Sequence, residues 1–280
     1  MNRLTSRTKK SFFNVASNFS ISITKSILSF VTRTIFIKIL GETALGLNGL
    51  FSNILSMLSL AELGIGTAIN FSLYEPLVNK NIKEINSLMA FYRRVYKLVG
   101  LFEIIIGLLL IPFLGVFIKS INEINNVHLI YILYLLNTAS TYFIAYKETL
   151  INADQKNYML TKINIFFLVV MNLFQIVILV LFKNYIAYLI IQFIIQLIQM
   201  IYTNIFISKQ YAYVDFKSNE KLSEKNKRVI KKNVKAMFFH KIGDYCTNGT
   251  DNLVISSFVN LETVGLYSNY LMIINIINSY

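Results

Sequence analysis

Apolar runs about as long as a membrane is thick recur along this chain and restrict the folds open to it. Each run holds roughly 20 residues, enough for a helix to cross a hydrocarbon core of about 30 Å. Of the 280 residues 55% are hydrophobic and only 15% are charged, which is too apolar for an ordinary soluble domain. Backbone groups in lipid are satisfied only in helices or closed barrels, and near-continuous apolar runs favour helices. The sequence therefore predicts an all-α, polytopic membrane protein.

Eight membrane spans are expected, and they leave no room for a sizeable soluble domain. The spans cover residues 12–40, 45–77, 92–118, 127–147, 163–182, 185–208 and 236–259, and an eighth begins near residue 263 and is cut at Tyr280. We expect three parts: a six-helix lobe over residues 1–208, a basic cytoplasmic connector over residues 209–235, and the first two helices of an incomplete second lobe over residues 236–280.

Lysine and arginine are distributed unevenly between the two sets of loops. If the N-terminus lies in the cytoplasm, most of the 27 basic residues fall in cytoplasmic segments. Many of these basic residues lie between Lys209 and Lys241. Basic residues accumulate in cytoplasmic loops. The sequence therefore predicts a multi-pass protein of the cytoplasmic membrane with its N-terminus inside. Its basic connector is expected to contact anionic membrane lipid and no nucleic acid.

A carboxylate, Glu62, interrupts the second apolar run. A charge on a lipid-facing surface at mid-bilayer costs at least about 2.5–3.5 kcal/mol, so Glu62 should face a protein interior or a water-filled cavity. At about 100° per residue, Asn48, Glu62 and Asn70 fall on one side of a helix over residues 45–77. We expect one helix with a polar stripe and an apolar back.

Two cations, Lys25 and Arg33, share a polar face of the first span with Ser29. They lie eight residues, or about 12 Å, apart along a helix axis. One interpretation places both in a cavity, and the other has them snorkel to opposite membrane interfaces, which suits Lys25 poorly in so long a span.

Further polar residues lie within other spans, and each leaves two interpretations open. In the seventh span Lys241, Asp244 and Asp251 share a face, which predicts either a structural ion pair or a cavity lining. Gln196 of the sixth span either lines a cavity or bonds a neighbouring helix. Glu103 stands alone in the third span, where pairing with a cation and protonation are both open to it.

Motifs for enzymatic or metal chemistry are absent from the sequence. It contains no nucleophile elbow, phosphate loop or zinc motif, and His128 and His240 are far apart. The single Cys246 excludes an intrachain disulfide. We expect no catalytic residue, no bound metal and no cofactor.

A short internal repeat supports the two-lobe organisation. An offset of 219 residues places GETALGL (Gly41 to Leu47) against NLETVGL (Asn260 to Leu266), with Gly46 over Gly265, and each follows a long span. Several transporter folds are built from two such parallel repeats.

The opening of the chain resembles a known family. Arg33, Leu40-Gly41, Leu45-Gly46-Leu47 and the run Ala61-Glu62-Leu63-Gly64-Ile65-Gly66, followed by Asn70-Phe71-Ser72-Leu73-Tyr74, look like the start of bacterial oligosaccharide and polysaccharide flippases. These belong to the multidrug/oligosaccharidyl-lipid/polysaccharide exporter superfamily. The resemblance is specific over about residues 33–77.

The resemblance implies a V-shaped pair of six-helix lobes around a central cavity. Such proteins move undecaprenyl-diphosphate-linked repeat units to the outer leaflet by alternating access, for O-antigen (lipopolysaccharide), capsule or another surface polysaccharide. It also implies that polysaccharide polymerases and glycosyltransferases are partners. The chain departs from the family, which has twelve to fourteen helices, because it ends in its eighth span.

Residue chemistry agrees with that implied substrate. A diphosphate needs cations along its path, and sugars need amides and hydroxyls. The expected substrate-binding residues are Lys25, Ser29, Arg33, Asn48, Gln196 and Lys241, and the expected coupling or charge-balancing residues are Glu62, Glu103, Asp244 and Asp251. A peptidoglycan-precursor flippase, a drug exporter, a non-transporting fragment and a membrane polysaccharide polymerase remain alternatives.

Overall fold

A computed structural model describes the backbone of residues 2–62, 65–118, 124–218, 220–248 and 250–278. Side chains are described from Thr24 onward, with exceptions that include Lys241 and Asp244. Within these ranges most of the chain is helical and no strand is present, which confirms the all-α prediction. The longer helices are α1 (Asn2–Leu58), α2 (Ile65–Val78), α3 (Ile82–Leu110), α5 (Val127–Ala153), α6 (Asn157–Phe182), α7 (Tyr185–Gln210), α8 (Glu224–Asn248) and α10 (Leu261–Asn278).

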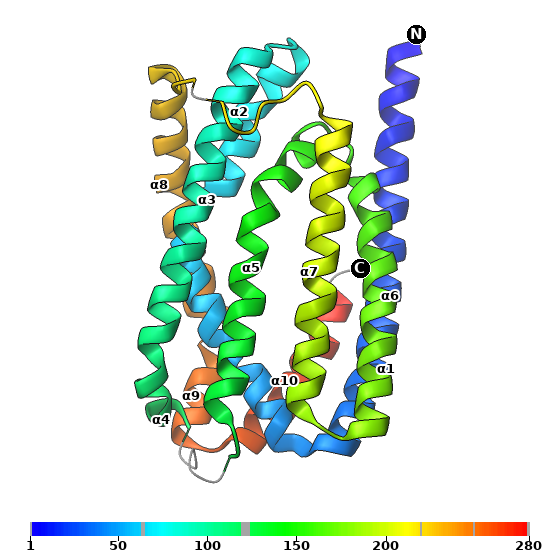
Figure 1. The fold of residues 1–280 in the computed structure, drawn as a ribbon, viewed down its shortest axis with the longest axis vertical. Helices are drawn as coiled ribbons and strands as arrows, with labels where there is room; N and C mark the ends of the chain where they lie inside the picture. Colours follow the sequence, from blue (N-terminus) through cyan, green and yellow to red (C-terminus); the bar gives the residue numbers. More distant parts are fainter. Residues whose placement is uncertain (1, 63–64, 119–123, 219, 249, 279–280) are drawn as a thin grey trace.

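Short helices complete the bundle. The 3-10 turns η1 (Ser59–Glu62) and η2 (Ile111–Phe113) and the helices α4 (Leu114–Phe117) and α9 (Asp251–Phe258) lie between the longer ones. Figure 1 shows α3, α5, α7 and α6 standing roughly parallel. The N-terminus and the α2–α3, α5–α6 and α7–α8 connections lie at one end, the basic end, and α4 and α9 lie at the other, the far end.

Five helices of the described chain are long and apolar enough to cross a membrane, whereas the sequence predicts eight spans. They cover Thr24–Leu58, Ile82–Phe117, Val127–Ala153, Asn157–Phe182 and Tyr185–Gln210. The expected second span is divided between two helices, and α8 begins with a run of lysines that lowers its hydropathy. The helix α7 matches the predicted sixth span to within two residues, whereas α5 and α6 each extend six residues beyond the predicted fourth and fifth spans at the basic end.

The first helix bends sharply at Gly41, near the break expected between the first two spans. Gly41 has φ 84° and ψ 176° inside the α1 helix. A positive φ of this size is open to glycine and strained for residues with a Cβ. The bend divides α1 into a first arm, residues 24–40, and a second arm, residues 42–58.

The single helix predicted over residues 45–77 is wrong, because the structure interrupts it. The second arm of α1 ends at Leu58, the tighter 3-10 turn η1 follows, and α2 begins at Ile65. Asn48 stays on the second arm of α1, whereas Glu62 in η1 accepts a hydrogen bond from the Tyr96 hydroxyl of α3. The predicted polar stripe is therefore divided between two environments.

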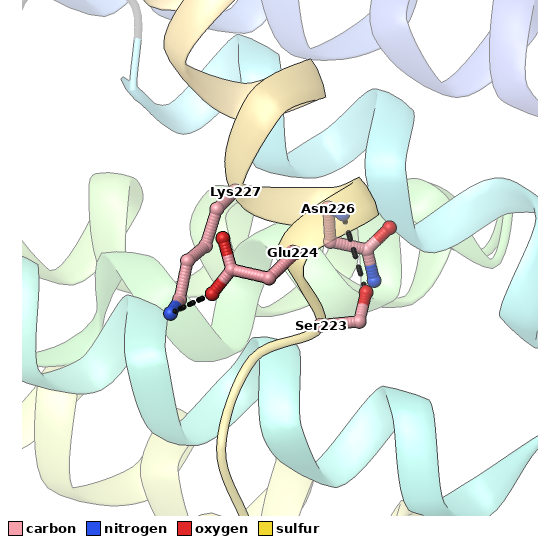
Figure 2. Close-up of polar contacts among 4 residues, drawn as sticks. All are labelled: Ser223, Glu224, Asn226 and Lys227. Atoms are coloured by element: carbon pink, nitrogen blue, oxygen red, sulfur yellow. Dashed lines mark hydrogen bonds and ion pairs between the residues drawn. The ribbon is translucent and has the colours of Figure 1, made fainter.

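The helix α8 begins inside the polar stretch that the sequence predicts as a connector, so residues 224–235 form its first turns. Figure 2 shows how it starts: the Ser223 hydroxyl oxygen accepts a hydrogen bond from the Asn226 backbone N–H at 3.2 Å, as in an N-cap. Lys227 pairs with Glu224 one turn apart at 2.7 Å. The Asn226 side chain also donates to Glu84 of α3 at 2.7 Å, which ties the start of α8 to the basic end.

The two glycines of the internal repeat pack against each other's helices at the far end. A Cβ placed on Gly46 would lie 1.9 Å from the Leu261 carbonyl oxygen, and one on Gly265 would lie 2.7 Å from the Glu42 carbonyl oxygen. Val264, beside them, is fully buried. The backbones of α1 and α10 therefore touch at positions that tolerate no side chain.

We predict that Gly46→Ala lowers the free energy of unfolding by about 1–3 kcal/mol, because the added methyl group forces the two backbones apart. Circular dichroism of the purified chain in detergent during heating would measure this as a lower unfolding midpoint. Gly115→Ala is the matched control, because a Cβ there meets nothing within 4 Å. Equal midpoints for the two variants would contradict the close packing.

Candidate functional site

Two adjoining cavities lie beside the first arm of α1 and share Ser29, Arg33, Asn48 and Met272 as lining residues. The larger, of about 470 Å³, lies between both arms of α1 and the helices α9 and α10. The smaller, of about 350 Å³, lies between α1, α6 and α7. Together they provide room of the size that small-molecule sites usually have.

Arg33 lies where the two cavities meet. Its Nε atom donates a hydrogen bond to the Asn269 side-chain oxygen of α10. Its Nη2 atom is buried and has no hydrogen-bond partner. A guanidinium held at one nitrogen and left open at another is suited to bind an anionic oxygen.

Other polar atoms without partners line the larger cavity. The Asn252 side-chain oxygen of α9 and the Ser268 hydroxyl of α10 are both buried and make no hydrogen bond. Leaving such groups unsatisfied costs roughly 1–3 kcal/mol each. Their presence beside Arg33 indicates a surface suited to a polar ligand or to water.

The smaller cavity has a wall of paired polar side chains. Thr32 donates to the Asn172 side-chain oxygen at 2.7 Å, and the Gln175 amide donates to the Gln192 side-chain oxygen at 3.1 Å. These contacts join α1 to α6 and α6 to α7. The wall is therefore built from satisfied amides and hydroxyls, with Tyr188 as its aromatic member.

The charged side chains that line the two cavities are all basic in the part of the chain that the structure describes. Among the described residues that line the two cavities, Lys25 and Arg33 are basic and none is acidic. The Lys25 side chain is exposed and that of Arg33 is half-buried. The residues predicted on the polar face of the first span, Lys25, Ser29 and Arg33, thus share a cavity with Asn48.

Other predicted site residues lie elsewhere. Gln196 lines neither cavity: its amide donates to the Asn137 carbonyl at 2.7 Å and to the Ser140 hydroxyl at 3.0 Å, so it joins α7 to α5. Asp251 begins α9 and accepts a hydrogen bond from the Tyr267 hydroxyl of α10. The side chains of Lys241 and Asp244 lie outside the described residues.

Two predicted carboxylates approach one another between α3, α5 and η1. Glu103 is 1% exposed, and the Tyr142 hydroxyl of α5 lies within reach of its carboxylate. Glu62 accepts a hydrogen bond from the Tyr96 hydroxyl. Glu62 and Tyr142 are close enough to Glu103 to interact with it electrostatically. In the described chain no cluster of three or more His, Cys, Asp or Glu side chains could hold a metal ion.

Sequence reasoning missed several cavity residues. Asn252 and Ser268, with open polar atoms, and Asn172 and Gln175, in the paired wall, received no role from the sequence. Each is an amide or hydroxyl within an apolar segment, which is the signal that could have singled them out. That signal is shared by residues that only join helices.

Comparison of the fold with solved structures finds a multidrug resistance transporter of the MATE family, in the MOP superfamily, in an inward-facing conformation. The similarity has a TM-score of 0.50 at 17% sequence identity and covers 86% of this chain. The chain spans 60% of the length of that transporter. No family model matches the sequence, and neither does any curated protein. The chain thus shares the fold of that transporter over most of its own length.

A charge-selective labelling experiment would test the cavity. With Cys246, which is exposed, replaced by serine, we expect Ser29→Cys to react faster with a sulfonate-bearing methanethiosulfonate than with a trimethylammonium-bearing one. A unit charge about 4 Å away is worth about 1 kcal/mol in water, so Arg33→Gln should slow the anionic reagent and speed the cationic one by about fivefold each, which lowers the rate ratio roughly thirtyfold.

Lys38→Gln is the matched control, because Lys38 is exposed on the same arm and lines neither cavity. The labelling rates are measured in the reconstituted protein by mass spectrometry. If the two charge variants lower the ratio equally, the positive potential is a property of the whole surface and not of the cavity.

Proposed function

We propose that the chain is a flippase for undecaprenyl-diphosphate-linked oligosaccharide repeat units, which it moves from the inner to the outer leaflet of the cytoplasmic membrane for surface polysaccharide synthesis. The observation that carries the proposal is the cavity lining, in which Lys25 and Arg33 are the charged members among the described residues. A positive lining suits an anionic substrate because an unpaired diphosphate is very costly to bring into a low-dielectric path.

Each lining residue has a role in this proposal. The open Nη2 atom of Arg33 would donate to a diphosphate oxygen, and Lys25 would add a mobile point charge nearby. Asn252 and Ser268 have open polar atoms that would bond sugar hydroxyls. The hydrocarbon chain of the substrate would remain in lipid beside the many apolar side chains that the helices expose.

Alternating access requires an interface that closes on one side of the cavity. In this proposal the contact of α1 with α10 at Gly46 and Gly265 would close the far end. With the basic end in the cytoplasm, as the distribution of lysine and arginine predicts, the cavity would receive substrate from the inner leaflet. Opening of the glycine contact would then release it outside.

A drug exporter is the second candidate, since the structurally similar transporter is described as a multidrug resistance protein. Cationic drugs favour acidic linings, and the described lining has no carboxylate. A peptidoglycan-precursor flippase uses the same diphosphate chemistry and differs from the main proposal only in the attached sugar.

Complementation would test the proposal. The chain is expressed in a strain that lacks its own polysaccharide flippase, and surface polymer is measured together with resistance to cationic drugs. We expect polymer to be restored, and Arg33→Ala and Lys25→Ala to reduce it about tenfold or more, because each removes a charge-assisted contact worth about 1.5–3 kcal/mol. Lys38→Ala, on the same arm, should leave it unchanged.

Direct binding gives a second readout that is independent of the host's sugar. Purified chain should retain undecaprenyl-diphosphate-linked oligosaccharide, and Arg33→Ala should release it while Lys38→Ala does not. Drug resistance without restored polymer and without lipid binding would favour the exporter alternative. Equal binding by all variants would show that the cavity is not the substrate site.

The Glu62 and Glu103 pair is proposed to couple transport to a proton or sodium gradient. An unpaired carboxylate buried in a membrane bundle is stable only when neutralised by a proton or a cation. We expect Glu103→Gln, which keeps the shape and removes the charge, to preserve folding and to abolish the dependence of transport on the gradient. Transport by reconstituted vesicles with imposed gradients measures this, and Glu262→Gln, on an exposed residue, is the control. Unchanged gradient dependence in Glu103→Gln would exclude the role.

A further inference from the structure

A third cavity lies at the basic end, away from the two described above. It has a volume of about 390 Å³ and shares no described lining residue with them. Its walls come from α3, α5 and α7, and the chain segment after α7, residues 214–217, covers it. We name it the connector pocket.

Lys147 of α5 is the buried centre of the connector pocket. Its side chain is only 6% exposed. Its ammonium donates to the Asn204 side-chain oxygen and to the Ser208 hydroxyl, both at 2.6 Å, and lies 4.6 Å from the centre of the Phe216 ring. All three partners are neutral, and within the described chain Lys147 forms no ion pair. A buried ammonium without a counter-charge carries a desolvation penalty of several kcal/mol.

More positive charge surrounds Lys147. Arg93 of α3 lines the pocket and is close enough to Lys147 to interact with it electrostatically. Lys217 adds a third cation from the covering segment. The single acid among the described lining residues is Asp215, which is exposed and accepts a hydrogen bond from the Lys217 backbone N–H at 2.8 Å. The lining therefore has an excess of positive charge around a buried lysine.

We propose that the connector pocket binds a phosphate group. A phosphate has oxygens enough to accept from Arg93, Lys147 and Lys217 together, and it supplies the counter-charge that Lys147 lacks. The hydrogen bonds to Asn204 and Ser208 hold the Lys147 ammonium in position, so the cation is preorganised for an anion.

Two sources offer this chemistry: the headgroup of an anionic phospholipid and free inorganic phosphate. Basic pockets between membrane helices at the cytoplasmic side suit lipid headgroups. Because the covering segment joins α7 to α8, an occupied pocket would also fix the start of the chain that leads to α8. This site is independent of the substrate cavity and does not rest on the flippase proposal.

The experiment uses the full chain and has two arms. In the lipid arm, nanodiscs of phosphatidylcholine contain a small fraction of phosphatidylglycerol, and native mass spectrometry counts the phosphatidylglycerol that stays bound. In the soluble arm, inorganic phosphate is titrated into protein in neutral detergent, with chloride at equal ionic strength as reference, and the unfolding midpoint is followed.

Arg93→Gln and Lys217→Gln are the test variants, because the buried Lys147 is needed for packing and its replacement could prevent folding. Lys97→Gln is the matched control: it removes one positive charge from α3 at an exposed position outside the pocket. We expect each test variant to weaken binding about tenfold or more, as for the loss of one charge-assisted hydrogen bond, and Lys97→Gln to leave it unchanged.

Either arm can support the proposal, and together they identify the source. Selective loss of bound phosphatidylglycerol in the two test variants assigns the pocket to a lipid headgroup. A phosphate-dependent rise in the midpoint, lost in the same variants, assigns it to free phosphate. If neither ligand binds, or if Lys97→Gln weakens binding as much as Arg93→Gln does, the proposal is overturned.

Discussion

The backbone contact between α1 and α10 is the constraint on which the rest of the structure depends. At Gly46 and Gly265 the two helices approach more closely than any side chain would allow. That approach places Asn252, Ser268 and Asn269 beside the first arm of α1 and so creates the larger cavity. Without the two glycines the helices would separate, and the cavity would lose the side that holds Arg33.

Sequence pattern predicted the parts of this fold that depend on local periodicity. The positions of α5, α6 and α7 follow from apolar runs, and the polar face of the first span follows from helical spacing. The interruption after Leu58 did not follow, because a 3-10 turn within an apolar run leaves the hydropathy unchanged. Gln196 was given a cavity role because an amide that joins two helices and one that lines a cavity have the same sequence pattern. Asn252 and Ser268 were missed because their open polar atoms result from packing between distant helices.

Ionisable groups lie without a counter-charge at three places in the described bundle. Arg33 has a buried, unpartnered nitrogen in the larger cavity, Lys147 lies among neutral partners in the connector pocket, and Glu103 is buried between α3 and α5 without an ion-pair partner in the described chain. Each arrangement lowers stability unless a ligand or a proton completes it. A bundle held together only for stability would instead fill such positions with apolar side chains, so these residues are the places where function and stability conflict.

The bend at Gly41 makes the cavity lining sensitive to the insertion or deletion of residues in α1. Ser29 and Arg33 lie on the first arm of α1 and Asn48 on the second, yet all three face the same cavities. The rotational setting of one arm against the other is fixed by the number of residues between them. Insertion of a single residue would turn the second arm by about 100° about its axis, which would carry Asn48 out of the cavity and Gly46 out of its contact. The cavity lining and the glycine contact therefore depend on the number of residues at the bend as well as on the glycine that allows it.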